Sequence, residues 1–533
     1  MAAHPSAKQQ DVHPTSTEGA LRPAPPAPSF ILRGHEAPIH AVHFFASNTF
    51  LVSGDEAGWI IVWDLWKRRQ IFKWRGHPTG SVLALQSIPV HACKGQPTEQ
   101  HTTKPSRRSR SGLKHHHENA RSVYIVSHGR DNNIHVWDIN TLLQQSLTRR
   151  SVSASRQTMG HEAALVFSLP VNALNFCKMS VLAIDAAASE TLQQQHEESP
   201  SGTLSLADTH RHIYIAVPSP TTPTLIDIYD IVKPERCFAS VGLSKASRAG
   251  ESEKKWGSVM AIRLFRTTLT DLLASPSGSD AQDDAATDKN EANKSENSAL
   301  LHMVVGYEDG TVMLFQETPI RSTIGHKSAG AKSKRIMDVV WTVKCHREPV
   351  LGLDLSSDMR FAISIGSDNA LVKYNLFSAQ QGVPKFIQVP LKTKGIAEVK
   401  VRNDSKIIAL AGWDGRIRIF SAKTLKPLAV LKHHREGLYC LDMAQIHEVD
   451  GISASEAGSS ASINRDEVAD NTAQAKESRQ PQHVATEDEG ESGSSSEDDS
   501  EEESALMDRR LWSKRHWIAA GGKENRISLW EIY

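Results

Sequence analysis

The phrase that decides the fold is VSGDEAGWIIVWD, residues 52–64, which returns as VSHGRDNNIHVWD at residues 126–138. Each copy has small or β-branched residues, then a turn with Asp and Gly or Asn, then an alternating run with an aromatic residue near its end. Alternation with a period of two predicts strands. Asp-Gly and Asn residues favour the tight turn of a hairpin. The phrase therefore predicts two antiparallel strands joined by a short turn.

The same hairpin phrase recurs along the whole chain. The other copies are VVGYEDGTVMLFQ (304–316), SIGSDNALVKYN (364–375), LAGWDGRIRIFS (410–421), AAGGKENRISLWE (519–531) and a weaker one at 206–230, which makes seven in all. Further alternating strands precede the copies at 39–45, 171–177, 258–265, 350–355, 397–401 and 438–443. Self-similarity at a fixed period is typical of propellers and solenoids.

The length agrees with an all-β, seven-bladed β-propeller. Without an N-terminal tail and six polar insertions, roughly 44 residues remain per repeat, the length of a four-stranded blade. We expect a disordered tail at 1–27 and a propeller at 28–533. Polar, biased composition predicts long disordered loops near 88–121, 182–202, 240–257, 266–300, 317–339 and 445–512.

The two ends of the chain are expected to meet in one blade. The segment 28–33 precedes the first repeat and has no earlier blade to join, while the chain finishes on the strand 527–532. Pairing of these two segments would close the ring and leave only short, protected sheet edges.

Two dipeptides give the repeats a family likeness. Gly-His stands at 34–35 and 76–77, and Trp-Asp at 63–64 and 137–138. The chain resembles the WD-repeat (WD40) family. That resemblance implies a structural set of His, Ser, Asp and an aromatic residue in a blade: His77, Ser127, Asp131 and Trp137 in blade 2, and His346, Ser364, Asp368 and Tyr374 in blade 5. In blade 1 it implies His35, Ser53 and Trp63, with Ala57 at the Asp position.

A Ser, a His and an Asp together also suit a hydrolase. Here the trio recurs from blade to blade, which a single active site would not do, and in a propeller it forms a buried hydrogen-bond network. No P-loop, GxSxG, HExxH or kinase signature is present. We therefore expect a scaffold that is not an enzyme, with no catalytic residues, cofactor, metal or small-molecule substrate.

Composition excludes several other classes. The 61 Lys and Arg balance 61 Asp and Glu, so the chain as a whole does not attract nucleic acid or membranes by its charge. No stretch has the ~20 apolar residues of a membrane-spanning helix, and no signal-peptide pattern opens the chain. Five cysteines without a CxxC pair are typical of a reducing compartment.

The expected loops carry strongly biased charge. Residues 104–114 and 321–335 are basic, and either a nuclear-import or nucleic-acid patch or a solvated loop would explain them. Residues 486–504 hold ten acids and no base, which suits contact with histones or a solubilising role, and Ser496 has the acidic context of a kinase site. The run His115–His117 lacks further ligands to complete a metal site.

One family of WD-repeat proteins is matched more specifically. The opening PAPPAPSFILRGHEAPIHAVHFF (23–45), the phrase FLVSGDEAGWIIVWDLWKRR (50–69), the blade 2 phrase and LIDIYDI (225–231) resemble the fungal ASTRA-associated WD-repeat family, and more distantly an animal G-protein-β-like protein. The resemblance implies a nuclear subunit of the ASTRA assembly. That assembly is linked to chromatin remodelling and to maturation of PI3K-like kinases, so the implied protein partners are such a kinase, helical-repeat cochaperones and AAA+ helicases, with chromatin contact at most indirect and no membrane.

A substrate receptor of a cullin-type ubiquitin ligase is the alternative. Such propellers often carry Trp-Asp-x-Arg after a blade strand. The two candidates here read Trp63-Asp64-Leu65-Trp66 and Trp137-Asp138-Ile139-Asn140, so the Arg is absent from both.

Overall fold

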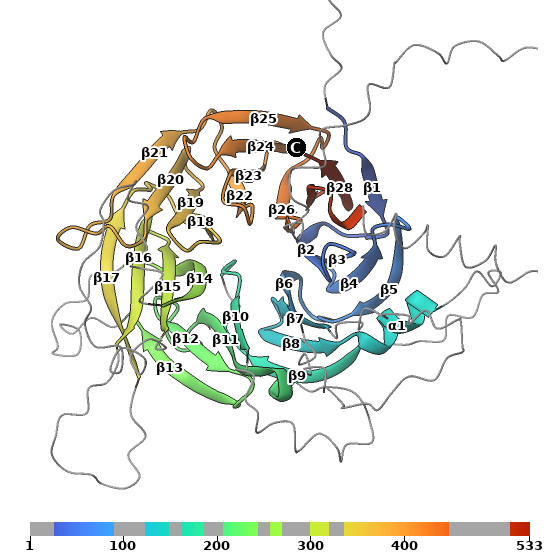
Figure 1. The fold of residues 1–533 in the computed structure, drawn as a ribbon, viewed down its shortest axis with the longest axis horizontal. Coiled ribbons are helices and arrows are strands. Elements are labelled where there is room, and N and C mark those ends of the chain that lie inside the picture. The colour runs from blue at the N-terminus through green and yellow to red at the C-terminus, as the bar shows by residue number, and fades with distance from the viewer. Residues whose placement is uncertain are drawn as a thin grey trace, which may run out of the picture.

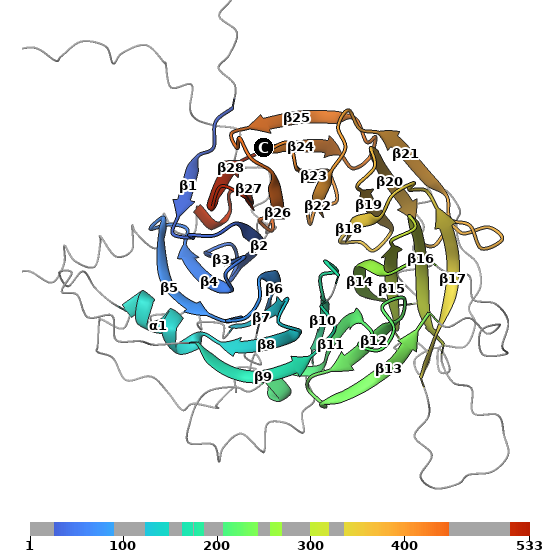
Figure 2. The same cartoon turned by 180° about the vertical axis from the view of Figure 1, so that it is seen from behind.

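The computed structural model describes residues 26–89, 123–148, 163–173, 175–185, 206–242, 256–268, 299–318, 335–446 and 512–532. They form seven four-stranded antiparallel sheets, arranged as blades around a central axis (Figure 1) and seen from behind in Figure 2. The fold is the predicted seven-bladed β-propeller.

Each blade runs from an inner strand at the axis to an outer strand on the rim. Blade 1 has β2 (Ile39–Phe45), β3 (Phe50–Asp55), β4 (Trp59–Asp64) and β5 (Arg69–Arg75), and blade 2 has β6 (Val82–Pro89), β7 (Val123–Gly129), β8 (Asn133–Asp138) and β9 (Ala164–Pro170). Blade 3 has β10 (Ser180–Asp185), β11 (His210–Pro218), β12 (Ile226–Asp230) and β13 (Glu235–Val241), and blade 4 has β14 (Val259–Thr267), β15 (Leu300–Tyr307), β16 (Thr311–Thr318) and β17 (Ile336–Lys344). Blade 5 has β18 (Val350–Leu355), β19 (Phe361–Gly366), β20 (Ala370–Asn375) and β21 (Phe386–Pro390), and blade 6 has β22 (Ile396–Val401), β23 (Ile407–Gly412), β24 (Arg416–Ser421) and β25 (Pro427–Lys432).

Blade 7 contains strands from both ends of the chain. Its first three strands are β26 (Leu438–Met443), β27 (Trp517–Gly522) and β28 (Arg526–Glu531). Its outer strand is β1 (Phe30–Arg33), which pairs antiparallel with β28 from Phe30 opposite Leu529 to Arg33 opposite Arg526. The segment before the first repeat therefore pairs with the last strand, as its position in the sequence led us to expect.

The inner strand of blade 3 was predicted wrongly. The segment 171–177 was expected to be that strand, but β10 (Ser180–Asp185) lies further on and runs into the insertion expected near 182–202. Asparagine side chains explain the difference: the N–H groups of Ala173 and Cys177 donate to the side-chain oxygens of Asn132 and Asn175 rather than to a strand. Strands also extend into other expected insertions, most of all β17, which begins at Ile336 within 317–339.

Two helices interrupt the all-β pattern of the described residues. Helix α1 (Asn140–Thr148) follows β8, and the short α2 (Leu206–Thr209) precedes β11. The side chain of Asn140, at the start of α1, accepts the backbone N–H of Val123 at 2.6 Å. Within the described ranges, no helix is long and apolar enough to cross a membrane.

The connections divide the ring into two faces. One face carries the turns between second and third strands and the links from each blade to the next. We call it the short-turn face, and we call the opposite one the insertion face. The chain between β6 and β7, β8 and β9, β10 and β11, β14 and β15, β16 and β17, and β26 and β27 departs from the insertion face, and in each of these connections some residues lie outside the described ranges. Most of the turns on the short-turn face are described.

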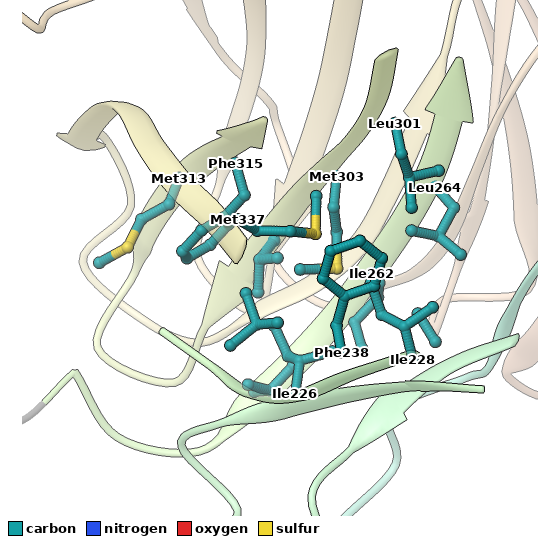
Figure 3. Close-up of a cluster of buried hydrophobic side chains, with 14 of the residues drawn as sticks. Ile226, Ile228, Phe238, Ile262, Leu264, Leu301, Met303, Met313, Phe315 and Met337 are labelled. Atoms are coloured by element: carbon teal, nitrogen blue, oxygen red, sulfur yellow. The ribbon is translucent and has the colours of Figure 1, made fainter. Parts of the chain in front are cut away.

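Apolar clusters between neighbouring blades hold the ring together. Figure 3 shows one of them, where Ile226, Ile228 and Phe238 of blade 3 pack against Ile262, Met303 and Phe315 of blade 4. Burial of such side chains is the main favourable contribution to folding. Comparable clusters lie at the other blade junctions.

A repeated hydrogen bond also links successive inner strands. In four junctions a side chain of one inner strand accepts a backbone N–H from the next: Gln86 from Val181 at 2.9 Å, Ser180 from Leu264 at 2.9 Å, Asp354 from Val401 at 2.7 Å and Asp442 from Phe44 at 2.9 Å. The last of these joins blade 7 to blade 1. Since the inner strands of adjacent blades are not paired as a ladder, these side chains satisfy N–H groups at the axis.

Candidate protein-interaction face

The residues expected to form blade networks come together in blades 2 and 5. In blade 2, the two ring nitrogens of His77 lie 3.0 Å from Asp131 and 2.8 Å from Ser127, and the indole N–H of Trp137 donates to Ser127 at 2.8 Å. In blade 5, the nitrogens of His346 lie 3.0 Å from Asp368 and 2.7 Å from Ser364, whose hydroxyl is 2.9 Å from that of Tyr374. Burial lowers the pKa of His346, although the hydrogen bond and charge of Asp368 act in the opposite direction. Each network thus ties together two strands and the preceding interblade link.

Blade 1 contains a complete network that was predicted to lack its acid. The carboxylate comes from Asp55 at the end of β3 and not from position 57. His35 lies 2.7 Å from both Asp55 and Ser53, and Trp63 donates to Ser53 at 2.7 Å. Asp55 also accepts the N–H groups of Ala57 and Trp59. Asp55, two residues before the expected position, therefore both binds His35 and caps the turn.

Blade 7 holds a network that sequence reasoning missed. His434 lies 2.9 Å from Glu524 and 2.8 Å from Ser528, and Trp530 donates to Ser528 at 3.0 Å. In the other networks the Ser precedes the aromatic residue by ten positions. Here Ala520 stands at that place, and the hydroxyl comes from Ser528, which pairs with Ala520 across the strands. The sequence signal was His434 before an inner strand, with an acid in the turn of the next hairpin.

The ligand atoms of His77, Asp131 and His135 lie within 4.8 Å of one another. Nδ1 of His135 is buried without a hydrogen-bond partner. Both nitrogens of His77 are already engaged by Asp131 and Ser127, so a cation would have to displace the bond between His77 and Asp131. We interpret the cluster as part of the blade 2 network.

Paired charges line the axis of the ring. Asp442 lies 3.1 Å from His43 and 3.5 Å from Lys400, and Arg263 lies 3.2 Å from Asp354. Burial alone would raise the pKa of Asp442, but Lys400 and His43 outweigh it and lower the pKa to about 2.

The ion pair of Lys178 and Glu398 crosses the channel, since it joins the link before blade 3 to the inner strand of blade 6. The cavity beside this pair has room for about one water molecule. The pair joins blades on opposite sides of the axis.

Exposed aromatic side chains gather on the short-turn face. Phe176 is 60% exposed and Trp413 is 49% exposed. Tyr439 and His40 stack with ring centroids 5.0 Å apart, and the guanidinium of Arg130 lies 4.6 Å above the Phe176 ring. We call these five residues the aromatic arc, because blades 6, 7, 1 and 2 contribute to it in ring order. Trp, Tyr and Arg are the residue types that dominate binding energy at protein interfaces.

Trp413 is held in place before any partner binds. Its backbone N–H donates to the carbonyl of Gly395 at 2.9 Å. Gly395 has a φ of 76°, and a Cβ at this position would lie 2.3 Å from the Trp413 ring. Only glycine meets both conditions. The ring is therefore fixed from below while half of it faces solvent, which reduces the entropic cost of binding.

The sequence did not single out the aromatic arc. Trp413 lies within a hairpin phrase, and the alternation of 171–177 predicts that Phe176 belongs to an inner strand. The charged segments 104–114 and 486–504, Ser496, the run His115–His117 and nearly all of 321–335 lie outside the described residues, so their predicted roles stay predictions.

Comparison with known proteins agrees with the repeat analysis. A model of the family "WD domain, G-beta repeat" matches residues 27–64. ASTRA-associated protein 1 of Aspergillus flavus is 28% identical over 528 residues, which cover 97% of this chain and 100% of the relative. The chain resembles ASTRA-associated protein 1 along nearly its whole length.

Two further relatives extend this result. The Aspergillus niger protein of the same name is 29% identical over 96% of this chain and 98% of its own length. The mouse guanine nucleotide-binding protein subunit beta-like protein 1 is 25% identical over 82% of this chain and 94% of its own. The expected resemblance to ASTRA-associated protein 1 and the distant one to a Gβ-like protein are both confirmed, and the fold is a WD40 propeller.

Proposed function

We propose that this protein is a non-catalytic WD-repeat scaffold that serves as a subunit of an ASTRA-type assembly. The observation that carries the proposal is the similarity to ASTRA-associated protein 1 along nearly the whole chain. By that resemblance its partners are a PI3K-like kinase, helical-repeat cochaperones and AAA+ helicases. It would act in the nucleus, in kinase maturation and in chromatin remodelling through its partners.

The short-turn face is the surface we assign to these contacts. Its aromatic arc supplies rigid, partly exposed side chains around a ring whose axis is closed by ion pairs. Rigid aromatic anchors with a charged surround are the usual centre of a protein interface. The blade networks support the face from below, because each ties an interblade link to a hairpin turn.

Affinity purification of the tagged full-length chain followed by mass spectrometry tests the proposal. We expect helicases and helical-repeat cochaperones to co-purify, and the double variant F176A/W413A to lose them. The matched control is Leu165→Ala, which removes an equally exposed apolar side chain from the outer strand of blade 2. Recovery of a cullin and its adaptor in place of these partners would contradict the proposal.

A fluorescent fusion tests the location separately. We expect the fusion to concentrate in the nucleus. An even distribution, or exclusion from the nucleus, would overturn that part of the proposal.

A further inference from the structure

The rim of blades 5 and 6 exposes more apolar surface than a solvated edge requires. On β21, Phe386 and Ile387 are 43% and 55% exposed, and on β25, Leu428 and Val430 are 58% and 39% exposed. Both strands are outermost in their sheets and follow one another on the rim in Figure 1 and Figure 2. Contiguous exposed apolar side chains mark interaction sites more often than isolated ones do.

Strand alternation turns several of these side chains toward the same junction. Val389 of β21 packs against the cluster between blades 5 and 6, so Lys385 and Ile387, at the same parity, face blade 6. Leu431 of β25 packs against the cluster between blades 6 and 7, so Val430, at the opposite parity, faces blade 5. Leu428 lies beside it at a register shift of the strand. By the same alternation, Lys432 shares the side of Val430, whereas Lys426 lies beyond the register shift. Lysines therefore flank an apolar centre, and we call these residues the blade 5–6 rim.

The charge around this rim has one sign. Segments 376–390 and 421–432, which run up to the ends of the two outer strands, contain Lys385, Lys423, Lys426 and Lys432 and no Asp or Glu. All four are exposed. Over the whole chain the charges balance, at 61 of each sign, so an arc without a single acid is a local feature.

The outer strands also offer backbone hydrogen bonds. Among the described residues, β21 pairs with β20 alone and β25 with β24 alone. The outward edge of such a strand presents N–H and C=O groups that a further strand can use. Proteins usually protect exposed edges with charges, and here the lysines repel cationic strands while attracting acidic ones.

We propose that the blade 5–6 rim binds an extended, acidic protein segment in which carboxylate and apolar side chains alternate. The apolar side chains would cover Ile387, Leu428 and Val430, the carboxylates would pair with the flanking lysines, and the backbone would add to an open strand edge. Single-stranded nucleic acid would satisfy the lysines but would leave these aliphatic side chains uncovered, so a protein segment fits better. This site lies on the rim, apart from the short-turn face, and its failure leaves the proposed function intact.

Fluorescence anisotropy with the full-length protein tests the inference. The probe is a labelled peptide in which Glu alternates with Val and Leu. We expect saturable binding that weakens roughly tenfold or more in I387S/V430S, and likewise in K385E/K432E. Two control variants should bind as the unaltered protein does. Leu165→Ser changes a side chain that is 53% exposed on β9, a strand without charged residues. Lys233→Glu changes an exposed lysine on a turn of blade 3. Thermal melts confirm that each variant is folded.

Several results would overturn the inference. Equal binding by the rim variants would place the peptide elsewhere, and equal binding of a poly-Glu peptide would reduce the effect to charge alone. Tighter binding of single-stranded nucleic acid, lost in K385E/K432E, would make the rim a nucleic-acid surface.

Discussion

At the scale of single residues, we expect removal of the serine hydroxyl at the centre of a blade network to destabilise the fold. Ser364 contacts both His346, at 2.7 Å, and Tyr374, at 2.9 Å, in a fully buried position. We expect Ser364→Ala to lower the free energy of unfolding by about 1–3 kcal/mol, because two buried polar groups lose a partner. Ser378→Ala is the control, since the Ser378 hydroxyl is buried without a hydrogen-bond partner. Equal melting temperatures of the two variants in thermal unfolding would contradict the network's structural role.

The corrected acid of blade 1 gives a second test. Asp55 bonds His35 and caps the turn through the N–H groups of Ala57 and Trp59. Asp55→Ala should lower the melting temperature, and the further change Ala57→Asp should fail to restore it. Rescue by the second change would mean that the sequence-based placement at position 57 was right. The sequence allowed either position, because an acid at either end of a tight turn keeps the same hairpin pattern.

Histidine burial predicts a pH dependence. Burial, with the nearby His77, lowers the pKa of His128 from 6.5 to about 3. The unfolded chain therefore takes up a proton below pH 6.5 that the folded chain refuses until about pH 3, so stability falls as pH falls through this window. From pH 7 to 5 we expect His128 to account for a loss of about 2 kcal/mol.

Denaturant unfolding at several pH values measures this effect. His128→Leu should flatten the slope of stability against pH, whatever its baseline. Val126→Ala, also fully buried on β7, should lower stability and keep the slope. An unchanged slope in His128→Leu would refute the assignment.

At the scale of elements, the hairpin phrases predicted the second and third strands of every blade. Each phrase contains its own turn, so local chemistry suffices to place it. The inner strand of blade 3 was predicted at the wrong segment because apolar and polar residues alternate in both 171–177 and β10. Only the asparagine contacts of the first segment distinguish the two. The network of blade 7 was not predicted because its serine, Ser528, lies on the strand opposite Ala520, the position where the other networks have their serine. Tertiary contacts decide both cases, and a single sequence does not display them.

The closing strand β1 gives a prediction at this scale. Leu32 is 3% exposed and packs with Trp63, Trp517 and Leu529. Deletion of residues 1–27 should leave the melting temperature unchanged, since β1 remains. Deletion of residues 1–34 removes β1 and exposes the edge of β28, so it should lower the melting temperature strongly and promote aggregation. If both truncations melt together, β1 does not close the ring.

At the scale of the whole molecule, the residues that stabilise the ring differ from those we assign to partner binding. Interblade clusters, four side-chain links at the inner strands and the paired charges of the axis make a rigid frame. The aromatic arc could not be predicted from the sequence, because its members come from four blades and share no spacing. The face they define emerges only when the ring closes.

Crosslinking mass spectrometry of the purified assembly tests most directly whether the short-turn face binds the partners. Lys394 and Lys523 lie exposed on that face, and Lys67 and Lys233 lie exposed on turns of the insertion face. The account predicts that crosslinks to other subunits concentrate on Lys394 and Lys523 and fall away in F176A/W413A. Crosslinks concentrated on Lys67 and Lys233, and unchanged in that variant, would contradict it.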